Sequence, residues 1–287
     1  MLRIGRIAYA NCTPIFHALQ ERYPDGDYSY VEGVPARLNA QLARGDIDVC
    51  PSSSIAYALN PERYLIIPDL SISSCGPVQS VLLFSAVPIG ELDGREVLLT
   101  AESATSVNLL KILLKQRYGC HCSFRVTNHA LNAALREAPA VLLIGDTALR
   151  ELQASSGVRV YDLGEQWYDW TGTPFVFALW LASRKAFDTH TEELRCLAGQ
   201  LRSAKAYALE NLDRIADVSP DADWMGRERL LHYWRSNLSY DLGREHCQGL
   251  ARFFRLAADM GLIEQAPELV FLEMGQGGVS PVVGTDG

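Results

Sequence analysis

The alternation of short apolar runs with amphipathic stretches is the feature that most constrains what this chain can fold into. Residues 3–9 have the pattern of a strand, and the stretch 13–19 opens with Thr-Pro and carries apolar residues at helical spacing. Pro35 suits a first helical position and Gly45 suits a helix C-terminus, so a second helix is expected between them. Such alternation predicts an α/β fold with mostly parallel strands covered by helices.

The alternation falls into two units, followed by a helical region. A second unit begins after a turn at 87–94, and the strongly apolar strand at 175–182 is expected to return the chain to the first unit. We therefore predict a bilobal protein, in which residues 1–86 and 184–287 form the first lobe and residues 87–183 the second. Ligands of open α/β sheets bind beyond the carboxyl ends of strands, so a central cleft that hinge closure can bury is expected.

Composition excludes several classes of partner. The chain has 287 residues and a formal net charge of −8, which argues against a nucleic-acid partner because phosphates need a basic face. No apolar run reaches the roughly 18 residues of a membrane span, and the first residues do not resemble a signal peptide. Seven scattered cysteines fit a reducing compartment, so a cytoplasmic location is expected. The oligomeric state, including a homo-oligomer, stays open, and the glycine-rich tail from Gln276 is expected to be frayed.

Two clusters of hydroxyl side chains stand where a predicted strand passes into a helix. They are Ser52, Ser53 and Ser54 after the strand 46–50, and Ser103, Thr105 and Ser106 after the strand 96–100. Free backbone N–H groups, the helix dipole and hydroxyl donors together make such a turn suited to an anion. Plain N-capping of the helix is the other interpretation of each cluster. Two anion sites on opposite lobes would suit a ligand with two carboxylates.

Other polar residues also follow predicted strands. Gly145-Asp146 comes after the strand 141–144, and Asp146 is either a helix N-cap or a carboxylate in the cleft. Asn11 comes after the first strand, where its amide either holds the turn or contacts a ligand. A run of serines from Ser71 to Ser80 lies near the first crossing between the lobes, although alternating serines are also typical of the solvent side of an edge strand.

Several chemistries lack the residues they require. Cys120-His121-Cys122 is accompanied by no second ligand pair at zinc-like spacing, so no metal site is predicted. A glycine-rich phosphate loop and a G-x-S-x-G elbow are both missing from the sequence. The residues expected in the cleft are hydroxyls, amides and one aspartate, a set more typical of a receptor than of an enzyme.

Taken together, the motifs resemble the chorismate dehydratase family over residues 3 to about 260. The motifs that carry the resemblance are Asn11 with Pro14, Gly33-Val34-Pro35 with Leu38-Asn39 and Leu42, Gly45-Asp46-Ile47-Asp48, Ser52-Ser53-Ser54-Ile55-Ala56-Tyr57, Asp69-Leu70-Ser71-Ile72-Ser73-Ser74, Gly76-Pro77-Val78-Gln79-Ser80-Val81, Ser103-Ala104-Thr105-Ser106-Val107, Gly145-Asp146 with Ala148-Leu149, and Pro174-Phe175-Val176-Phe177-Ala178 with Trp180. Family members usually have glutamate at the position of Ala56, so this chain lacks that carboxylate.

The resemblance implies a type II periplasmic-binding-protein-like fold used for catalysis. The family's reaction, in the futalosine route to menaquinone, is a hydro-lyase step that removes water from chorismate to give 3-[(1-carboxyvinyl)oxy]benzoate, with no cofactor and no metal. The two carboxylates of chorismate match the two hydroxyl-rich helix starts. Alternatives are the related 1,4-dihydroxy-6-naphthoate synthase of the same pathway and a non-catalytic cytosolic receptor for a small carboxylate.

The resemblance also implies roles for the candidate residues. Asn11 and Ser80 are expected to be catalytic, through hydrogen bonds to the reacting region of the substrate. The residues expected to bind the rest of the substrate are Ser52, Ser53, Ser54, Ser103, Thr105, Ser106, Gly145 and Asp146. With no strong base among them, the enolpyruvyl carboxylate of the substrate is the expected base, and the elimination is expected to pass through a stabilised carbanion.

Overall fold

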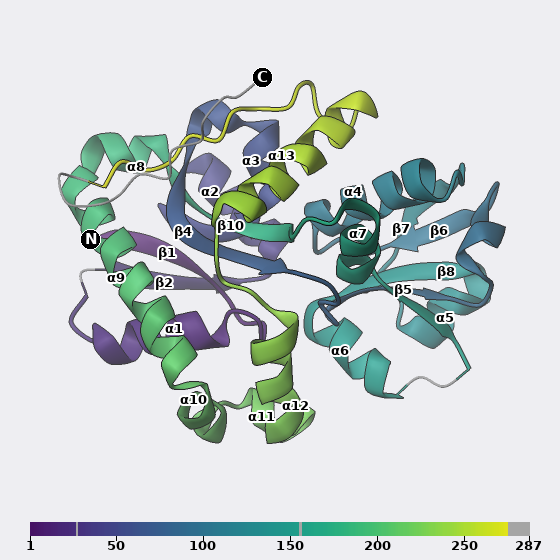
Figure 1. The fold of residues 1–287 in the computed structure, drawn as a ribbon. Coiled ribbons are helices and arrows are strands. Elements are labelled where there is room, and N and C mark those ends of the chain that lie inside the picture. Colours follow the sequence, from purple (N-terminus) through teal and green to yellow (C-terminus); the bar gives the residue numbers. More distant parts are fainter. Residues whose placement is uncertain (27, 155–156, 275–287) are drawn as a thin grey trace.

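Two five-stranded sheets, one in each lobe, form the frame of the protein in a computed structural model (Figure 1). The structure describes residues 1–26, 28–154 and 157–274, so the tail predicted to be frayed from Gln276 lies outside the described residues. The strands of the first sheet are β1 (Leu2–Ile7), β2 (Tyr28–Gly33), β3 (Val49–Ser53), β4 (Tyr64–Ser74) and β10 (Phe175–Ser183). Those of the second are β5 (Val81–Ser85), β6 (Glu96–Leu99), β7 (Ser123–Val126), β8 (Ala140–Ile144) and β9 (Arg159–Asp162).

Helices cover both sheets and fill much of the C-terminal third. They are α1 (Thr13–Arg22), α2 (Pro35–Arg44), α3 (Ser54–Leu59), α4 (Ala104–Ile112), α5 (Leu131–Glu137), α6 (Gly145–Ala154), α7 (Leu163–Thr171), α8 (Arg184–Thr189), α9 (Thr191–Glu210), α10 (Leu212–Val218), α11 (Asp221–Met225), α12 (Arg227–His232) and α13 (Arg244–Asp259). Pro35 is the first residue of α2 and Gly45 ends it with φ of 78°, as the sequence predicts. In the part of the chain that the structure describes, no helix is both long and apolar enough to cross a membrane.

The two sheets share one topology. Their strand orders are β2-β1-β3-β10-β4 and β7-β6-β8-β5-β9. In each sheet the first three strands run parallel, and the fourth is antiparallel to both of its neighbours. That antiparallel strand is β5 in one sheet and β10 in the other, and each is the first strand after the chain crosses between lobes. The predicted α/β fold with mostly parallel strands is confirmed.

Sheet pairing bears on where the lobes divide. β5 lies before residue 87 but pairs with β8 and β9 of the second sheet. β10 lies before residue 184 but pairs with β3 and β4 of the first sheet. Grouping the chain by sheet pairing would divide it one strand earlier at each crossing than the boundaries predicted from the sequence. We propose that the first lobe ends with β4 and resumes at β10.

The boundaries predicted for the strand before the first hydroxyl cluster are wrong. The first hydroxyl cluster was expected to follow a strand at 46–50, whereas β3 runs from Val49 through Ser53 and α3 begins at Ser54. The strand continues because β10 pairs alongside it, with Trp180 opposite Pro51. Asp48, inside the predicted strand, instead accepts hydrogen bonds from the backbone and guanidinium of Arg3.

The outer strand β4 of the first sheet is covered by later parts of the chain. Ile66 forms a bridge with Phe271, and Ser73 forms one with Ser239. The hydroxyl of Ser71 donates to the carbonyl of Asp241, so these serines are buried beneath the segment before α13. The solvent-facing interpretation of the serine run is therefore wrong, although β4 is an edge strand as that interpretation requires.

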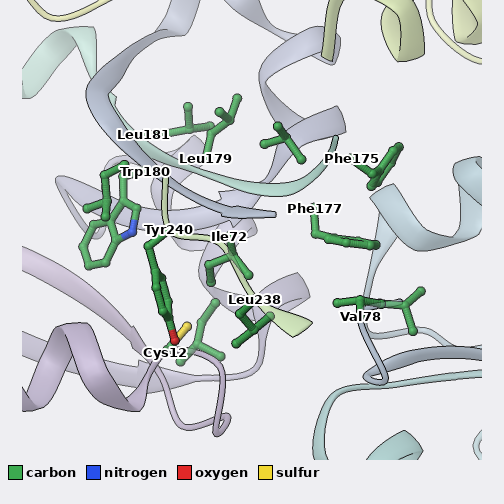
Figure 2. Close-up of a cluster of buried hydrophobic side chains, with 14 of the residues drawn as sticks. Cys12, Ile72, Val78, Phe175, Phe177, Leu179, Trp180, Leu181, Leu238 and Tyr240 are labelled. Atoms are coloured by element: carbon green, nitrogen blue, oxygen red, sulfur yellow. The ribbon is translucent and has the colours of Figure 1, made fainter. Parts of the chain in front are cut away.

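Aromatic residues fill the core where β10 re-enters the first lobe. The ring centroids of Phe175 and Phe253 lie 5.0 Å apart, and Trp167 meets Phe175 edge to face at 5.1 Å. Helix α13 approaches closely, since a Cβ added to Gly249 would lie 2.0 Å from the Pro174 carbonyl oxygen. Figure 2 shows the adjoining cluster, in which the ring of Tyr240 reaches down to Cys12.

Candidate functional site

A cavity lies between the lobes, in the position where a bilobal α/β protein is expected to bind a small molecule. Its polar lining consists of Tyr9, Asn11, Ser53, Ser80, Ser103 and Ser106. Its apolar lining consists of Ile7, Cys12, Pro35, Pro51, Ile72, Val78, Val81, Ile144, Gly145, Phe177 and Ala178. The cleft expected at the carboxyl ends of strands is present, with walls from β1, β3, β4, β8 and β10 and the segments that follow them.

The electrostatic character of this lining is unusual for an anion site. Among the described residues that line it there is no lysine, arginine or histidine. Positive potential comes instead from helix N-termini, because Pro35, Ser103 and Gly145 each stand at the start of a helix. Burial raises the pKa of both Tyr9 and the Cys12 thiol, so neither side chain is ionised near neutral pH.

Asn11 carries an acceptor without a protein partner. Its side-chain oxygen Oδ1 is buried and accepts no hydrogen bond from the described residues. Its backbone oxygen accepts from the hydroxyl of Tyr240 at 2.8 Å. Buried polar atoms normally have a partner, so a lone acceptor at a cavity wall is available to a donor on a ligand. This geometry favours ligand contact over turn-holding for the Asn11 amide.

Ser80 faces the cavity from the second lobe, at the end of a tightly held turn. The N–H groups of Val78 and Gln79 donate to the carboxylate of Asp162, at 3.0 and 2.6 Å. Gln79 has φ of 59°, a left-handed backbone conformation that residues other than glycine seldom adopt. The hydrogen bonds to Asp162 help to hold the turn in this conformation. The backbone of Ser80 is fixed in turn by the N–H of Gly145, which donates to its carbonyl at 2.8 Å.

The hydroxyl cluster at the start of α4 both caps the helix and faces the cavity. Ser103 caps the helix, accepting from the N–H of Ser106 at 3.2 Å, and its hydroxyl oxygen lies 3.0 Å from that of Ser106. Both serines line the cavity. Thr105 is fully buried and points elsewhere: its oxygen accepts from the backbone N–H of Ile55, in the other lobe, at 3.0 Å. Thr105 therefore joins the lobes and does not line the cavity.

Of the three serines at the start of α3, only Ser53 lines the cavity. Its hydroxyl accepts from the amide of Asn39 at 2.8 Å. The hydroxyl of Ser54 donates to the carbonyl of Val176 at 2.8 Å, beneath the cavity wall. Ser52 is fully buried within β3 and also lies off the cavity.

Gly145 and Asp146 have separate places. Gly145 lines the cavity with φ of 60°, and a Cβ added to it would lie 2.9 Å from the ring of Tyr9. Asp146 lies outside the lining, where it accepts from the N–H of Ala10 at 3.1 Å. Burial raises the pKa of Asp146 to about 6, and the negative charges of Asp221 and Glu102 add to this shift. The carboxylate thus bridges the lobes.

Sequence reasoning missed three cavity residues of clear consequence. Tyr9 lines the cavity, and its hydroxyl donates to Glu102 of the other lobe at 3.0 Å. The sequence placed Tyr9 at the end of the strand predicted over 3–9, whereas β1 ends at Ile7 and Tyr9 lies with Asn11 in the segment that follows. Phe177 and Val78, both labelled in Figure 2, also line the cavity and add to its apolar wall. No local pattern marks which residue of the apolar strand β10 faces the cleft.

The Cys120-His121-Cys122 run lies far along the second lobe. His121 pairs with Asp93 at the surface, while the Cys120 thiol is buried against the carbonyl of Ile89. Within residues 1–26, 28–154 and 157–274, no three histidine, cysteine or acidic side chains are grouped as metal ligands would be.

Comparison with known proteins gives this cavity a family context. A family model described as menaquinone biosynthesis matches residues 2–259. The chain belongs to that family. It is 31% identical to a chorismate dehydratase of Thermus thermophilus over 266 residues, which cover 87% of this chain and 93% of that protein. It is also 27% identical to the 1,4-dihydroxy-6-naphthoate synthase of the same organism, over 94% of this chain and 99% of that protein.

Solved structures confirm the fold of this family member. A protein of Archaeoglobus fulgidus superposes with a TM-score of 0.74 at 20% identity, covering 91% of this chain and 98% of that one. The periplasmic aliphatic sulphonate binding protein of Escherichia coli superposes with a TM-score of 0.66 at 18% identity, covering 100% and 97%. The predicted bilobal fold of the type II periplasmic-binding-protein class is thus correct.

Proposed function

We propose that this protein is a chorismate dehydratase, a hydro-lyase that converts chorismate into 3-[(1-carboxyvinyl)oxy]benzoate. The observation that carries the proposal is the lone acceptor of Asn11 in an inter-lobe cavity that holds hydroxyl donors but no ionised base. Relatives named chorismate dehydratase support it, from Thermus thermophilus and, at 29% identity over 61% of this chain, from Campylobacter jejuni.

The lining suits a small dicarboxylate with an unsaturated ring. Ser53 on one lobe and Ser103 with Ser106 on the other supply hydroxyls beside helix starts, and each set would receive one carboxylate. Phe177 and Val78 would pack on the ring between them. Hydroxyls and helix dipoles hold a carboxylate without the strong field of an arginine, so the substrate's charges stay available for chemistry.

The substrate supplies most of the driving force for this reaction. The proton to be lost lies on the ring carbon that bears the enolpyruvyl ether, where the ring carboxylate activates it through a double bond. Loss of the neighbouring hydroxyl then makes the ring aromatic. The enzyme's task is accordingly to position the substrate and stabilise charge, rather than to supply a strong acid or base.

The base in this proposal is the enolpyruvyl carboxylate of the substrate itself. No carboxylate, imidazole or amine side chain lines the cavity among the described residues, and the Tyr9 and Cys12 side chains are neutral. The carboxylate takes the ring proton, leaving a carbanion that the ring carboxylate delocalises. The C–O bond to the hydroxyl then breaks, and the departing oxygen receives that proton and leaves as water.

Asn11 and Ser80 would act on the departing hydroxyl. The Asn11 Oδ1 atom would accept a hydrogen bond from that hydroxyl and orient the C–O bond, which gives this buried acceptor the partner it lacks. The Ser80 hydroxyl would donate to the same oxygen as negative charge develops there. We further propose a cytoplasmic location, which the seven free cysteines support.

The test is to mix purified protein with chorismate, without added metal or cofactor, and follow absorbance and mass. We expect an aromatic product lighter by one water. Binding with chorismate recovered unchanged would leave a non-catalytic receptor, and would contradict the enzyme proposal. If chorismate neither binds nor reacts, the substrate of 1,4-dihydroxy-6-naphthoate synthase is the next to try, because that relative aligns over 94% of this chain.

A further inference from the structure

The backbone that carries Asn11 is held from both lobes. The carbonyl of Ala10 accepts from the indole N–H of Trp234 at 2.8 Å. The carbonyl of Asn11 accepts from the hydroxyl of Tyr240, also at 2.8 Å. The N–H of Ala10 donates to the Oδ1 atom of Asp146 at 3.1 Å. Three bonds thus fix three consecutive peptide units next to the lone acceptor of the cavity.

These bonds differ in when they can form. The Tyr240 segment is joined to β4 of the first sheet, since the carbonyl of Tyr240 accepts from the N–H of Ser71 at 3.0 Å, and Trp234 is buried shortly before it in the chain. Asp146 stands in the first turn of α6, directly after β8 of the second sheet. Its bond to Ala10 therefore joins the two lobes, and separation of the lobes is expected to break it.

Asp146 lies within a series of contacts between the lobes. On one side the Tyr9 hydroxyl donates to Glu102. On the other, the guanidinium carbon of Arg150 lies 3.9 Å from the centre of the Trp224 ring. Of the second-lobe side chains in this series, Asp146 is the one that bonds the backbone next to Asn11.

We infer that Asp146 is a positioning residue that completes the placement of Asn11 when the lobes close. It lies outside the cavity lining, so it acts through Ala10 and not on the substrate. The closed arrangement thereby has a better-placed Asn11 than the open one, which couples closure to turnover. This inference rests on the proposed dehydratase function.

The experiment compares three variants with the wild type by steady-state kinetics on chorismate. Asp146→Ala removes the acceptor, and we expect kcat to fall about 10- to 100-fold with KM changed less than about threefold, because small misplacements of reacting groups cost this much. Asp146→Asn keeps an oxygen acceptor without the charge, so we expect kcat within about threefold of the wild type. Asp93→Ala is the control, since Asp93 also accepts from a backbone N–H, that of His121 at 2.7 Å, on the surface of the same lobe.

Two kinetic results would overturn the inference. One is unchanged kcat in Asp146→Ala; the other is a rise in KM alone, which would indicate substrate binding. If Asp146→Ala fails to fold, Asp146→Ser provides the same comparison with a shorter side chain.

A second measurement does not depend on the reaction. Hydrogen exchange of the Ala10 amide should be about tenfold faster in Asp146→Ala than in the wild type, Asp146→Asn or Asp93→Ala. If the wild type does not convert chorismate, the proposed function fails, yet this exchange still decides whether Asp146 holds the segment. Equal exchange in all four proteins would overturn the inference.

Discussion

The first turns of α3 and α4 look alike in the sequence and do different work in the structure. Both carry several hydroxyls after a strand. At α4, Ser103 and Ser106 face the cavity, whereas at α3 only Ser53 does. Ser54 bonds the carbonyl of Val176 below the wall, and the α3 turn meets Thr105 of the other lobe. A hydroxyl-rich turn therefore marks either a ligand-facing wall or a joint between lobes.

The difference follows from how each turn satisfies its free N–H groups. At α4 the N-cap residue Ser103 itself accepts from the N–H of Ser106, so this N–H group needs no acceptor from the other lobe. The turn of α3 has no side-chain cap of its own. The N–H of Ile55 is instead satisfied by Thr105, which caps α3 from across the lobe boundary. The comparison predicts losses of activity on the cavity side and losses of stability at the joint.

The largest effect is expected on the cavity side, at Asn11. Asn11→Ala should lower kcat about 100-fold, because a group that contacts the reacting atoms is lost, with little change in melting temperature. Asn108→Ala is the matched control, since that amide bonds the carbonyl of Ala104 one turn back on α4. Steady-state kinetics and thermal unfolding check both variants. Wild-type turnover in Asn11→Ala would remove the catalytic role proposed for this residue.

At the joint, Thr105→Val should act mainly on stability. The substitution keeps the shape but leaves the buried N–H of Ile55 without an acceptor, so the free energy of unfolding should drop by about 1–3 kcal/mol. Urea denaturation measures it, and Thr105→Ser, which keeps the hydroxyl, should lose much less. A large rise in KM with unchanged stability would instead place Thr105 on the ligand.

Ser106 tests the opposite side of the comparison. Ser106→Ala should raise KM about three- to tenfold through loss of one hydrogen bond to a substrate carboxylate, a change of about 1 kcal/mol. Stability should hold, because the cap of α4 uses the backbone N–H of this residue. Ser54→Ala should show the reverse, with lower stability and an unchanged KM. Both variants are measured by steady-state kinetics on chorismate and by urea denaturation. A raised KM in Ser54→Ala together with lower stability in Ser106→Ala would contradict the roles given to these two serines.

The smallest effect concerns the pH dependence of stability at Asp146. Its pKa is about 6 in the folded protein, raised mainly by burial from an ordinary value near 4. Because the folded value is the higher one, this carboxyl stabilises the fold most below about pH 4, and that contribution is lost as pH rises through 6. The unfolding free energy of the wild type minus that of Asp146→Asn should fall by roughly 1 kcal/mol from pH 4 to 7. Urea denaturation across this range should show a fall, and a rise would contradict the assignment.

Local signals predicted much of the fold. Helix ends are marked by a proline in the first turn at Thr13-Pro14 and Pro35, by a left-handed glycine at Gly45 and by the capping hydroxyl of Ser103, and the structure has helices that begin or end there. The end of β3 was not predictable, since it depends on pairing with β10 more than a hundred residues later. For the same reason the sequence could not predict that β5 belongs to the second sheet, since its partner β8 comes more than fifty residues later.

The sequence identified the right segments of the site but not which of their side chains point into the cavity. Asn11, Ser53, Ser80, Ser103, Ser106 and Gly145 all reach the cavity, while Ser52, Ser54, Thr105 and Asp146 do not. Neighbouring residues on a helix turn point about 100° apart, so Thr105 and Ser106 face different surfaces. Which of them meets the ligand depends on how α4 packs against the other lobe, and this is absent from local sequence.

The covering of β4 has a consequence for how copies of this protein can associate. An edge strand normally presents unpaired backbone groups to which another molecule can add a strand. Here Ile66 exchanges hydrogen bonds with Val270 and Leu272, and Ser73 does so with Ser239. The chain occupies both ends of its own sheet edge, so strand addition by a second molecule would first have to displace these segments. A homo-oligomer is expected to join through helices or through one of the other sheet edges, at β2, β7 or β9.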